Sequence, residues 1–422
     1  MKTDKSYLDY MYSFIDRICK EIGPRLAGTE KEIQAIDEIE KEVKNCSDET
    51  MRDDFYCTNQ AYPGGFRTVA GILSVIGFCF FPTPISIVTT ILCTLGLVVL
   101  VMELMVLAEF IDFLYKKKKS QNIFGKIKPT STTKKLIIFG GHSDSAYNIP
   151  FSKYGNKMNT MLYLAILLGV YALILGLIKF ILQFILQDFV MFEFSIAGIP
   201  IFTITIIDFI FFIPFLGWFP YFLYVVINFI GKTMVQGAND NLSGVAVALG
   251  IGKYLSQNRP KHVEVWFGSF GAEEVGQRGS KAFVKKYGKQ GILDNSLTVV
   301  LESVGGGEGI GILTTEKMYF TTHFKEVYKP LEQAFLKYKE ENKTKGIVPY
   351  KLHEAVFAGT DAVRFSLKGY PACAIVGGAI ETFFIKNWHS PDDIPENLNT
   401  KIMRDVLETC LYFVELIDQQ VS

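Results

Sequence analysis

Residues 134–145 read KKLIIFGGHSDS, and this stretch points to the fold of the chain. The apolar run from Leu136 to Phe139 ends in two glycines, and His142 and Asp144 follow two positions apart. A short apolar run that ends in turn residues is typical of a strand buried on both faces of a sheet. The sequence therefore predicts a buried strand that presents a histidine and an aspartate at its tip.

Similar apolar runs follow farther along the chain. They are VEVWFGSF at 263–270, LTVVLES at 297–303 and YPACAIVGG at 370–378. Segments with helical periodicity alternate with them, such as NLSGVAVALGIGKYLSQN at 241–258. Continuous apolar strands between helices indicate a parallel sheet that is covered on both faces. We therefore expect an α/β fold with a mostly parallel central sheet flanked by helices.

The composition excludes some classes of protein. The chain has 422 residues, of which 49% are hydrophobic, and its formal net charge is zero. No basic stripe with interleaved aromatic residues occurs, so we expect no nucleic-acid partner. The seven cysteines are scattered without a CxxC pair, which favours free thiols in a reducing compartment. The charged, amphipathic N-terminus has no run typical of a signal peptide.

Two long apolar blocks interrupt the polar chain. A membrane-spanning helix needs about 20 apolar residues. The first block is broken by PTP at 82–84 and fits two such helices. In the second, MLYLAILLGVYALILGLI at 161–178 is one predicted span and 199–230 another, while 179–194 is expected along the membrane interface. Asp208 falls inside the last span, so we expect a structural partner for its carboxylate.

The sequence thus predicts two transmembrane helical hairpins inserted into one catalytic domain. The hairpins are residues 67–115 and 158–231, and the domain comprises residues 1–66, 116–157 and 232–422. Both ends of each hairpin return to the domain, so the domain can close while the hairpins anchor it to a lipid bilayer.

Acidic residues and histidines gather at the predicted strand ends. In open α/β sheets, ligands bind at the carboxyl ends of the strands. Histidines with several carboxylates form an N/O site that suits zinc, or two zinc ions if one carboxylate bridges them. Of two adjacent acids, one can bind metal while the other acts as general base. The residues concerned are His142, Asp144, Asp240, Glu273, Glu274, Glu302 and His389.

The motifs GGHSDS, GANDNLSGVA, FGAEEVGQRGS, LESVGGG, AGTDAVRFSLKGYPA and WHSPDDIPENL occur in this order. The chain in this respect resembles the co-catalytic di-zinc exopeptidases, which include bacterial leucyl aminopeptidases, aminopeptidase Y and glutamate carboxypeptidase. EIGPRLAGTEKE near the N-terminus resembles the opening helix of that family. The resemblance covers nearly all of the polar chain and none of the apolar blocks.

The resemblance implies a role for each residue of the cluster. His142 and Glu302 would bind one zinc ion, Glu274 and His389 the other, and Asp240 would bridge the two. Glu273 would act as the general base. Asp144 would orient the His142 ring, and Asp393 would do the same for His389. The family also implies a cis peptide bond between Asp240 and Asn241.

Some positions depart from the family pattern. Soluble aminopeptidases usually have Asp at the position of Glu302. Many relatives have a tyrosine that stabilises the oxyanion at the position of Trp388, whose indole N–H can donate one hydrogen bond. Glutaminyl cyclases also carry Trp there. His353 is a second candidate for an oxyanion or substrate contact, whereas His262 and His323 are expected at the surface.

We therefore expect a membrane-anchored zinc metallo-aminopeptidase that acts on peptides. A glutaminyl cyclase, a non-catalytic receptor-like protein and a transporter with a regulatory domain are the alternatives. A homo-oligomer is left open. Lys and Arg gather in the flanks on the catalytic side of both hairpins, which places this side in the cytoplasm, at the plasma membrane.

Overall fold

The computed structural model describes residues 2–155, 157–186, 190–342, 348–355, 359–379 and 384–422. The chain forms two compact units. Unit 1 comprises Met1–Asn59, Lys116–Asn148 and Lys232–Ser422, and unit 2 comprises Gln60–Tyr115 and Ile149–Gly231. Each unit is therefore built from segments that are far apart in the sequence.

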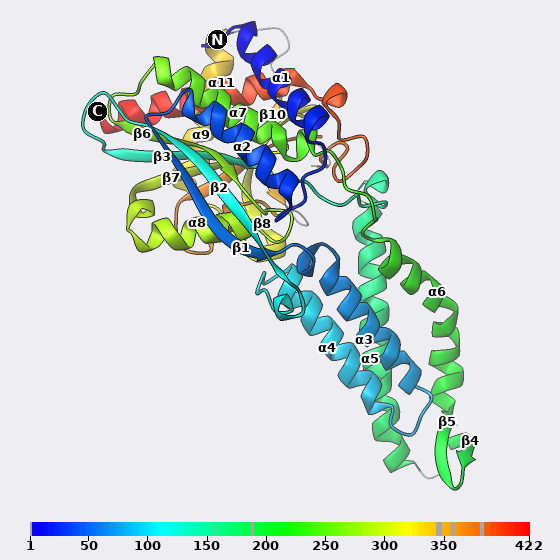
Figure 1. Cartoon of the computed structure of the whole chain (residues 1–422). Coiled ribbons are helices and arrows are strands. Elements are labelled where there is room, and N and C mark those ends of the chain that lie inside the picture. The colour runs from blue at the N-terminus through cyan, green and yellow to red at the C-terminus, as the bar shows by residue number, and fades with distance from the viewer. Residues whose placement is uncertain (1, 156, 187–189, 343–347, 356–358, 380–383) are drawn as a thin grey trace. The chain divides into compact units, whose positions relative to one another are not determined.

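Unit 1 is organised around a nine-stranded sheet in its described part, in the order β1-β2-β6-β3-β7-β11-β8-β10, with β9 paired to β8 (Figure 1). The strands β6, β3, β7 and β11 in the middle are parallel, whereas β1 and β2 join the sheet antiparallel. The strands are β1 (Glu49–Thr58), β2 (Lys117–Ile127), β3 (Lys135–His142), β6 (Val263–Phe270), β7 (Ser296–Glu302), β8 (Gly309–Glu316), β9 (Thr321–Thr322), β10 (Tyr350–Ala355) and β11 (Ala372–Gly378).

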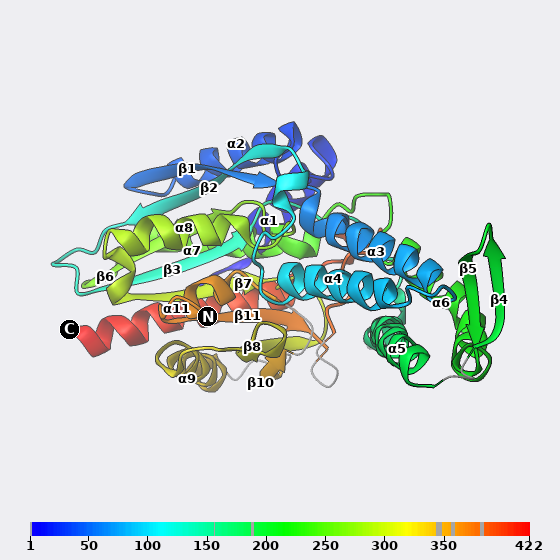
Figure 2. The same cartoon turned by 90° about the horizontal axis from the view of Figure 1, so that it is seen from below.

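Helices cover both faces of this sheet (Figure 2). Strand β3 shows why, because Ile137 and Phe139 point into one buried cluster while Leu136 and Ile138 point into the other. The first cluster includes α1 (Lys5–Glu21), α2 (Glu30–Lys44), α7 (Gly244–Gln257), α9 (Lys325–Asn342) and α11 (Thr400–Val421); the second includes α8 (Arg278–Lys289) and α10 (Ala362–Ser366). The predicted α/β fold with a central sheet covered by helices on both faces is confirmed. The sheet is mixed rather than mostly parallel, because in its described part β1, β2, β8 and β9 form four antiparallel pairs beside the four parallel pairs.

Unit 2 contains the apolar blocks. Its main elements are α3 (Phe66–Phe80), α4 (Ile87–Leu104), α5 (Lys157–Ile185), β4 (Val190–Ile196), β5 (Ile199–Thr205), η4 (Asp208–Phe212) and α6 (Ile213–Asn228). In the described part of the chain, three helices are long and apolar enough to cross a membrane: Ala61–Phe80, Ile87–Leu104 and Lys157–Ile185. The Pro-containing break after Phe81 separates α3 from α4, as the sequence predicts.

The return half of the second block differs from its prediction. Instead of one long span over 199–230, a β-hairpin of β4 and β5 precedes η4 and α6, and the apolar helix there, Phe215–Asn228, is shorter. The run from Ile199 to Thr205 is rich in Ile and Thr, whose branched side chains favour strands. The segment 179–194, expected along the interface, is divided between α5 and β4, and its residues 187–189 lie outside the described residues.

The partner expected for Asp208 is Lys179. The Lys179 Nζ lies 2.9 Å from Asp208 Oδ2 and donates to the carbonyls of Phe81 and Thr203, both at 2.8 Å. The Asp208 carboxylate also accepts a hydrogen bond from Thr205 N. Since a buried charge needs both a counter-charge and hydrogen bonds, this network explains how an acid is tolerated within an apolar unit.

Candidate metal centre

Three neighbouring parallel strands deliver the first residues of the site to one edge of the sheet. His142 is the last residue of β3, and Glu302 is the last residue of β7. Strand β6 ends at Phe270, opposite His142 in the register, and Glu273 and Glu274 follow in the next turn. Parallel strands end at a common edge, so residues from distant parts of the sequence meet there.

Asp240 lies between the two histidines. Its Oδ1 is 3.2 Å from His142 Nε2, and its Oδ2 is 3.3 Å from His389 Nε2. Glu302 Oε1 lies 3.8 Å from His142 Nε2, and Glu274 Oε2 lies 3.2 Å from His389 Nε2. Each oxygen of one carboxylate thus belongs to a different group of candidate ligands, which is the arrangement of a bridging ligand.

The spacing of these atoms fits zinc. Ligand atoms about 2.0–2.1 Å from a tetrahedral zinc ion are roughly 3.3 Å apart. The separations above are close to that value, and the groups His142–Asp240–Glu302 and Asp240–Glu274–His389 each offer ligand atoms within 4.8 Å of one another. Among the described residues, Asp240 Oδ2 and Glu274 Oε1 are buried without a hydrogen-bond partner. Both residues belong to the group Asp240–Glu274–His389, so a cation there would satisfy these oxygens.

The electrostatics of the cluster also favour cations. Burial raises the pKa of Glu302 to about 7, and it raises the pKa of Glu273 well above its usual range, with Asp361 and Glu274 adding to the effect. Burial alone would lower the pKa of His389, but Glu274 and Asp240 raise it to about 10. Acidic groups therefore dominate the cluster, and divalent cations would offset this excess of negative charge.

The family comparison covers most of this cluster. Residues 225–414 match the model of peptidase family M28. This stretch includes Asp240, Glu273, Glu274, Glu302 and His389. His142 lies upstream of the M28 match, on the other side of the second apolar block. A comparison with curated proteins found no match.

Solved structures share the fold. The zinc aminopeptidase BSAP from Bacillus subtilis is similar, with a TM-score of 0.54, 14% identity and coverage of 96% of this chain and 94% of that chain. A Zn-dependent exopeptidase from Parabacteroides distasonis is also similar, with a TM-score of 0.53, 14% identity and coverage of 96% of this chain and 97% of that chain. For a glutaminyl cyclase from Bacteroides thetaiotaomicron the TM-score is 0.52 and the identity 15%, with coverage of 96% of this chain and 97% of that chain. With the M28 match, these likenesses confirm the resemblance found in the motifs and support a zinc metallopeptidase.

Asp144 contacts the His142 ring, as the resemblance implies, and it also contacts a second segment of the chain. Its Oδ1 lies 3.4 Å from His142 Nδ1, and its carboxylate also accepts hydrogen bonds from the backbone N–H groups of Glu273 (2.9 Å) and Glu274 (3.0 Å). Asp144 thus connects the ends of β3 and β6. A sequence pattern gives no signal for this second contact, because the two segments are 129 positions apart.

Asp393 contacts the backbone beside Asp240 in the described structure, and the role at the His389 ring that the resemblance implied stays a prediction. In the described structure its carboxylate accepts hydrogen bonds from Asn239 N at 2.6 Å and Asp240 N at 3.1 Å. Burial and the nearby Asp240 raise the pKa of Asp393 to about 7. Asp393 therefore positions the backbone of the candidate bridging residue. The peptide bond between Asp240 and Asn241 is cis, as the family implies.

The other aromatic and histidine predictions have mixed outcomes. The Trp388 ring stacks on His389 with a centroid distance of 4.1 Å, and its oxyanion role stays a prediction. His353 lies in β10, paired in register with Leu313 of β8, and its role also stays a prediction. The surface placement of His323 is wrong, because its ring is buried between Glu316 Oε1 (2.8 Å) and Ser366 Oγ (2.9 Å).

The surface placement of His262 is also wrong. It is 8% exposed, and its backbone N–H donates to Asp418 at 2.6 Å. His262 stands directly before Val263, the first residue of β6. Its burial follows from this position, because β6 lies inside the sheet between β2 and β3. Neither histidine belongs to the metal-ligand groups that the described residues form.

The sequence reading missed Arg25. This side chain is fully buried, and its guanidinium donates to the carbonyls of Ser143 (2.8 Å), Gln236 (2.6 Å) and Gly237 (3.2 Å). It thus joins the loop after His142 to the turn before Asp240. The signal in the sequence was the motif EIGPRLAGTEKE, in which this arginine directly follows Gly23 and Pro24.

Backbone pairing joins the same two segments. Asn148 N donates to Thr233 O at 2.8 Å, Val235 N donates to Ala146 O at 3.0 Å, and Tyr147 and Met234 form an antiparallel bridge. The chain therefore closes across the base of the second insertion. This closure brings the candidate ligands His142 and Asp240 together although residues 149–231 separate them in sequence.

Proposed function

We propose that the chain is a membrane-anchored di-zinc aminopeptidase. The observation that carries the proposal is the Asp240 carboxylate, whose two oxygens face two different histidines. Asp240, His142 and Glu302 would hold one ion, and Asp240, Glu274 and His389 the other. When bound, the two ions would polarise the scissile carbonyl and the attacking water.

Glu273 is the residue we assign to proton transfer. Its Oε2 lies 3.8 Å from His142 Nε2, and Asp144 holds its backbone N–H. The carboxylate would accept a proton from the attacking water and deliver it to the amine that leaves. Its neighbour Glu274 faces His389 instead, so the two adjacent acids have different tasks.

The free α-amino group of a peptide is the feature we expect the site to recognise. The carboxylates of Glu273 and Glu302 are close to His142 and could bind an ammonium group. The test is a set of peptides with free or acetylated N-termini, incubated with the zinc-loaded protein, with products identified by mass. Acetylation should abolish cleavage. Equal cleavage of both sets would refute the aminopeptidase assignment.

A glutaminyl cyclase is the second candidate, because Trp388 stacks on the candidate ligand His389 and the M28-like fold is shared with glutaminyl cyclases. The same assay separates the two functions. A peptide with N-terminal Gln would lose only ammonia if the chain were a cyclase. Release of the N-terminal residue supports the peptidase.

Unit 2 is the proposed anchor in the bilayer, because three of its helices are long and apolar enough to cross a membrane. We further propose that unit 1 lies on the cytoplasmic side of the plasma membrane. The support is the run of Lys116 to Lys119, together with Lys153 and Lys157, in the segments that flank the apolar blocks.

A further inference from the structure

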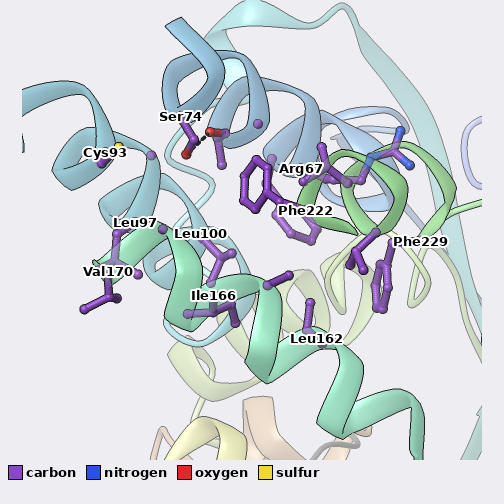
Figure 3. Close-up of a pocket in the computed structure, with 18 of the residues that line it drawn as sticks. Arg67, Ser74, Cys93, Leu97, Leu100, Leu162, Ile166, Val170, Phe222 and Phe229 are labelled. Atoms are coloured by element: carbon purple, nitrogen blue, oxygen red, sulfur yellow. Dashed lines mark hydrogen bonds between the residues drawn. The ribbon is translucent and has the colours of Figure 1, made fainter. Parts of the chain in front are cut away.

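A pocket opens among the helices of unit 2. It has a volume of about 790 Å³, including the part open to the surface, and α3, α4, α5 and α6 contribute to its wall. Figure 3 shows Leu97, Leu100, Leu162, Ile166 and Val170 around it. Ser74 is a polar residue of the wall, and its hydroxyl already donates to Ala70 O at 2.8 Å. The interior therefore suits an apolar chain.

Gly169 is an open position in the wall of the pocket, because a Cβ atom placed on it would meet nothing within 4 Å. Gly71 and Gly96 also line the pocket, but they allow close packing of the helices, since Cβ atoms there would meet Val226 Cγ1 at 2.6 Å and Ala70 O at 3.0 Å. Glycine inside a helix costs about 0.8–1.0 kcal/mol relative to alanine. Gly169 thus keeps open a volume that any other residue would begin to fill.

Arg67 supplies a positive charge at one end of the pocket. It stands in the first turn of α3, and Figure 3 shows it on the same side as Phe222 and Phe229. In the described part of the chain, its recorded hydrogen bonds both start from Nη1, to the carbonyls of Ile227 (3.2 Å) and Ile230 (3.1 Å). A guanidinium has five N–H donors, so donors remain for an anion.

The dimensions match one leaflet of a bilayer. The lining residues run from Cys93 to Leu104 on α4 and from Leu162 to Leu173 on α5. At 1.5 Å per residue, each stretch is roughly 16 Å long, about half of a hydrocarbon core of ~30 Å. Arg67 stands in the first turn of α3 and Leu104 ends α4, so the charged end is the end at which the first hairpin starts and finishes.

We propose that this pocket binds an anionic phospholipid, with one acyl chain along the apolar wall and the phosphate at Arg67. Burial of the chain and a charge-assisted hydrogen bond to the phosphate would act together. The inference rests on the proposed membrane location of unit 2, and it does not depend on the peptidase chemistry. It assigns to unit 2 a ligand in addition to its role as an anchor.

Native mass spectrometry of the detergent-purified full chain tests the proposal. Phosphatidylglycerol and phosphatidylcholine of equal chain length are added separately, and the bound fraction is measured. We expect one phosphatidylglycerol per chain, bound about tenfold more tightly than phosphatidylcholine. Arg67→Gln should remove this difference between the two lipids. Equal binding of both lipids to the unaltered protein would overturn the assignment.

Two matched variants test whether the pocket itself is the site. Gly169→Leu should lower binding of both lipids at least tenfold, because the new side chain occupies the space of the acyl chain. Gly217→Leu is the control, since a Cβ on Gly217 also meets nothing within 4 Å and Gly217 does not line the pocket. Unchanged binding by Gly169→Leu, or equal loss in both variants, would contradict the proposal.

Two further measurements separate this proposal from its alternatives. Tighter binding of oleate than of phosphatidylglycerol would show that the pocket prefers a free fatty acid, which would overturn the assignment. Peptide hydrolysis is measured on the same preparations, so the lipid site and the proposed peptidase can fail independently of each other.

Discussion

The position of a single carboxylate, that of Asp240, depends on residues that are not themselves candidate ligands. Asp393 accepts hydrogen bonds from the backbone N–H groups of Asn239 and Asp240. The Asn241 side chain donates to Leu301 O at 2.8 Å and accepts from Ser303 N at 3.0 Å. The turn that carries Asp240 is thus fixed to the end of β7, where Glu302 lies.

Replacing Asp393 should weaken metal binding without touching a ligand. In Asp393→Asn the amide can offer one oxygen, and its NH₂ group opposes one of the two N–H donors. We expect zinc affinity to fall by about 10–100-fold. Competition with a chelating dye measures it. Asp392→Asn, at an exposed neighbouring position, is the control, and equal affinity in both variants would show that Asp393 does not position the site.

At this scale the sequence predicts residue types well and contacts poorly. Most of the candidate ligands could be named because they stand at or soon after the end of a predicted strand, and the structure brings them together. The partners of Asp144 and Asp393 could not be predicted, because they are backbone N–H groups of distant segments. His323 was misplaced for another reason: its partner Glu316 is near in sequence, but the burial of both side chains comes from tertiary packing.

Among the elements, the segment between α1 and α2 has a larger part in the site than its length suggests. Arg25 lies in it and connects the loop after β3 to the turn before α7. The neighbouring Glu32 of α2 accepts hydrogen bonds from Gly28 N (2.6 Å) and Ala272 N (3.1 Å). The N-terminal segment thus supports three of the loops that carry candidate ligands.

Arg25→Lys should therefore disturb the site from a distance. An ammonium group cannot reproduce the fork of donors that reaches four carbonyls, those of Gly23, Ser143, Gln236 and Gly237. Each buried carbonyl left unpaired costs about 1–3 kcal/mol. We expect a lower free energy of unfolding and a lower zinc affinity. Arg17→Lys, whose side chain is 38% exposed, is the control. If urea unfolding and zinc titration cannot distinguish the two variants, Arg25 has no such role.

The elements of unit 1 were easier to predict than those of unit 2. The strands β3, β6, β7 and β11 are uninterrupted apolar runs bounded by turns, so their period and length identify them. In unit 2 the main helices and β5 are all apolar, and hydropathy alone does not separate a helix from a strand. The β4–β5 hairpin was missed for this reason.

On the scale of the whole molecule, the proposed membrane location of the insertions limits how the chain would meet a bilayer. Both apolar blocks leave unit 1 and return to it, so all four junctions should lie on one side of the membrane. Positively charged flanks favour the cytoplasmic side. This orientation would give the candidate metal centre access to cytoplasmic peptides.

Cysteine labelling in intact cells tests the orientation. Ser131, exposed in unit 1, and Ser195, exposed in β4 of unit 2, are each replaced by Cys in a background without the exposed Cys79. An impermeant maleimide should label position 195 in intact cells and position 131 only after permeabilisation. Labelling at position 131 alone in intact cells would show the opposite topology, with unit 1 and its substrates outside the cell.

In the proposed mechanism, Asp240 bridges two zinc ions while Glu273 transfers the proton. Bound zinc per chain, determined by elemental analysis on the same samples as peptide turnover, tests it most directly. We predict two ions in the unaltered protein. Glu273→Gln should also retain two ions, with turnover lower by several orders of magnitude, whereas Asp240→Ala should lose zinc. Full zinc content in Asp240→Ala, or full activity in Glu273→Gln, would contradict the account.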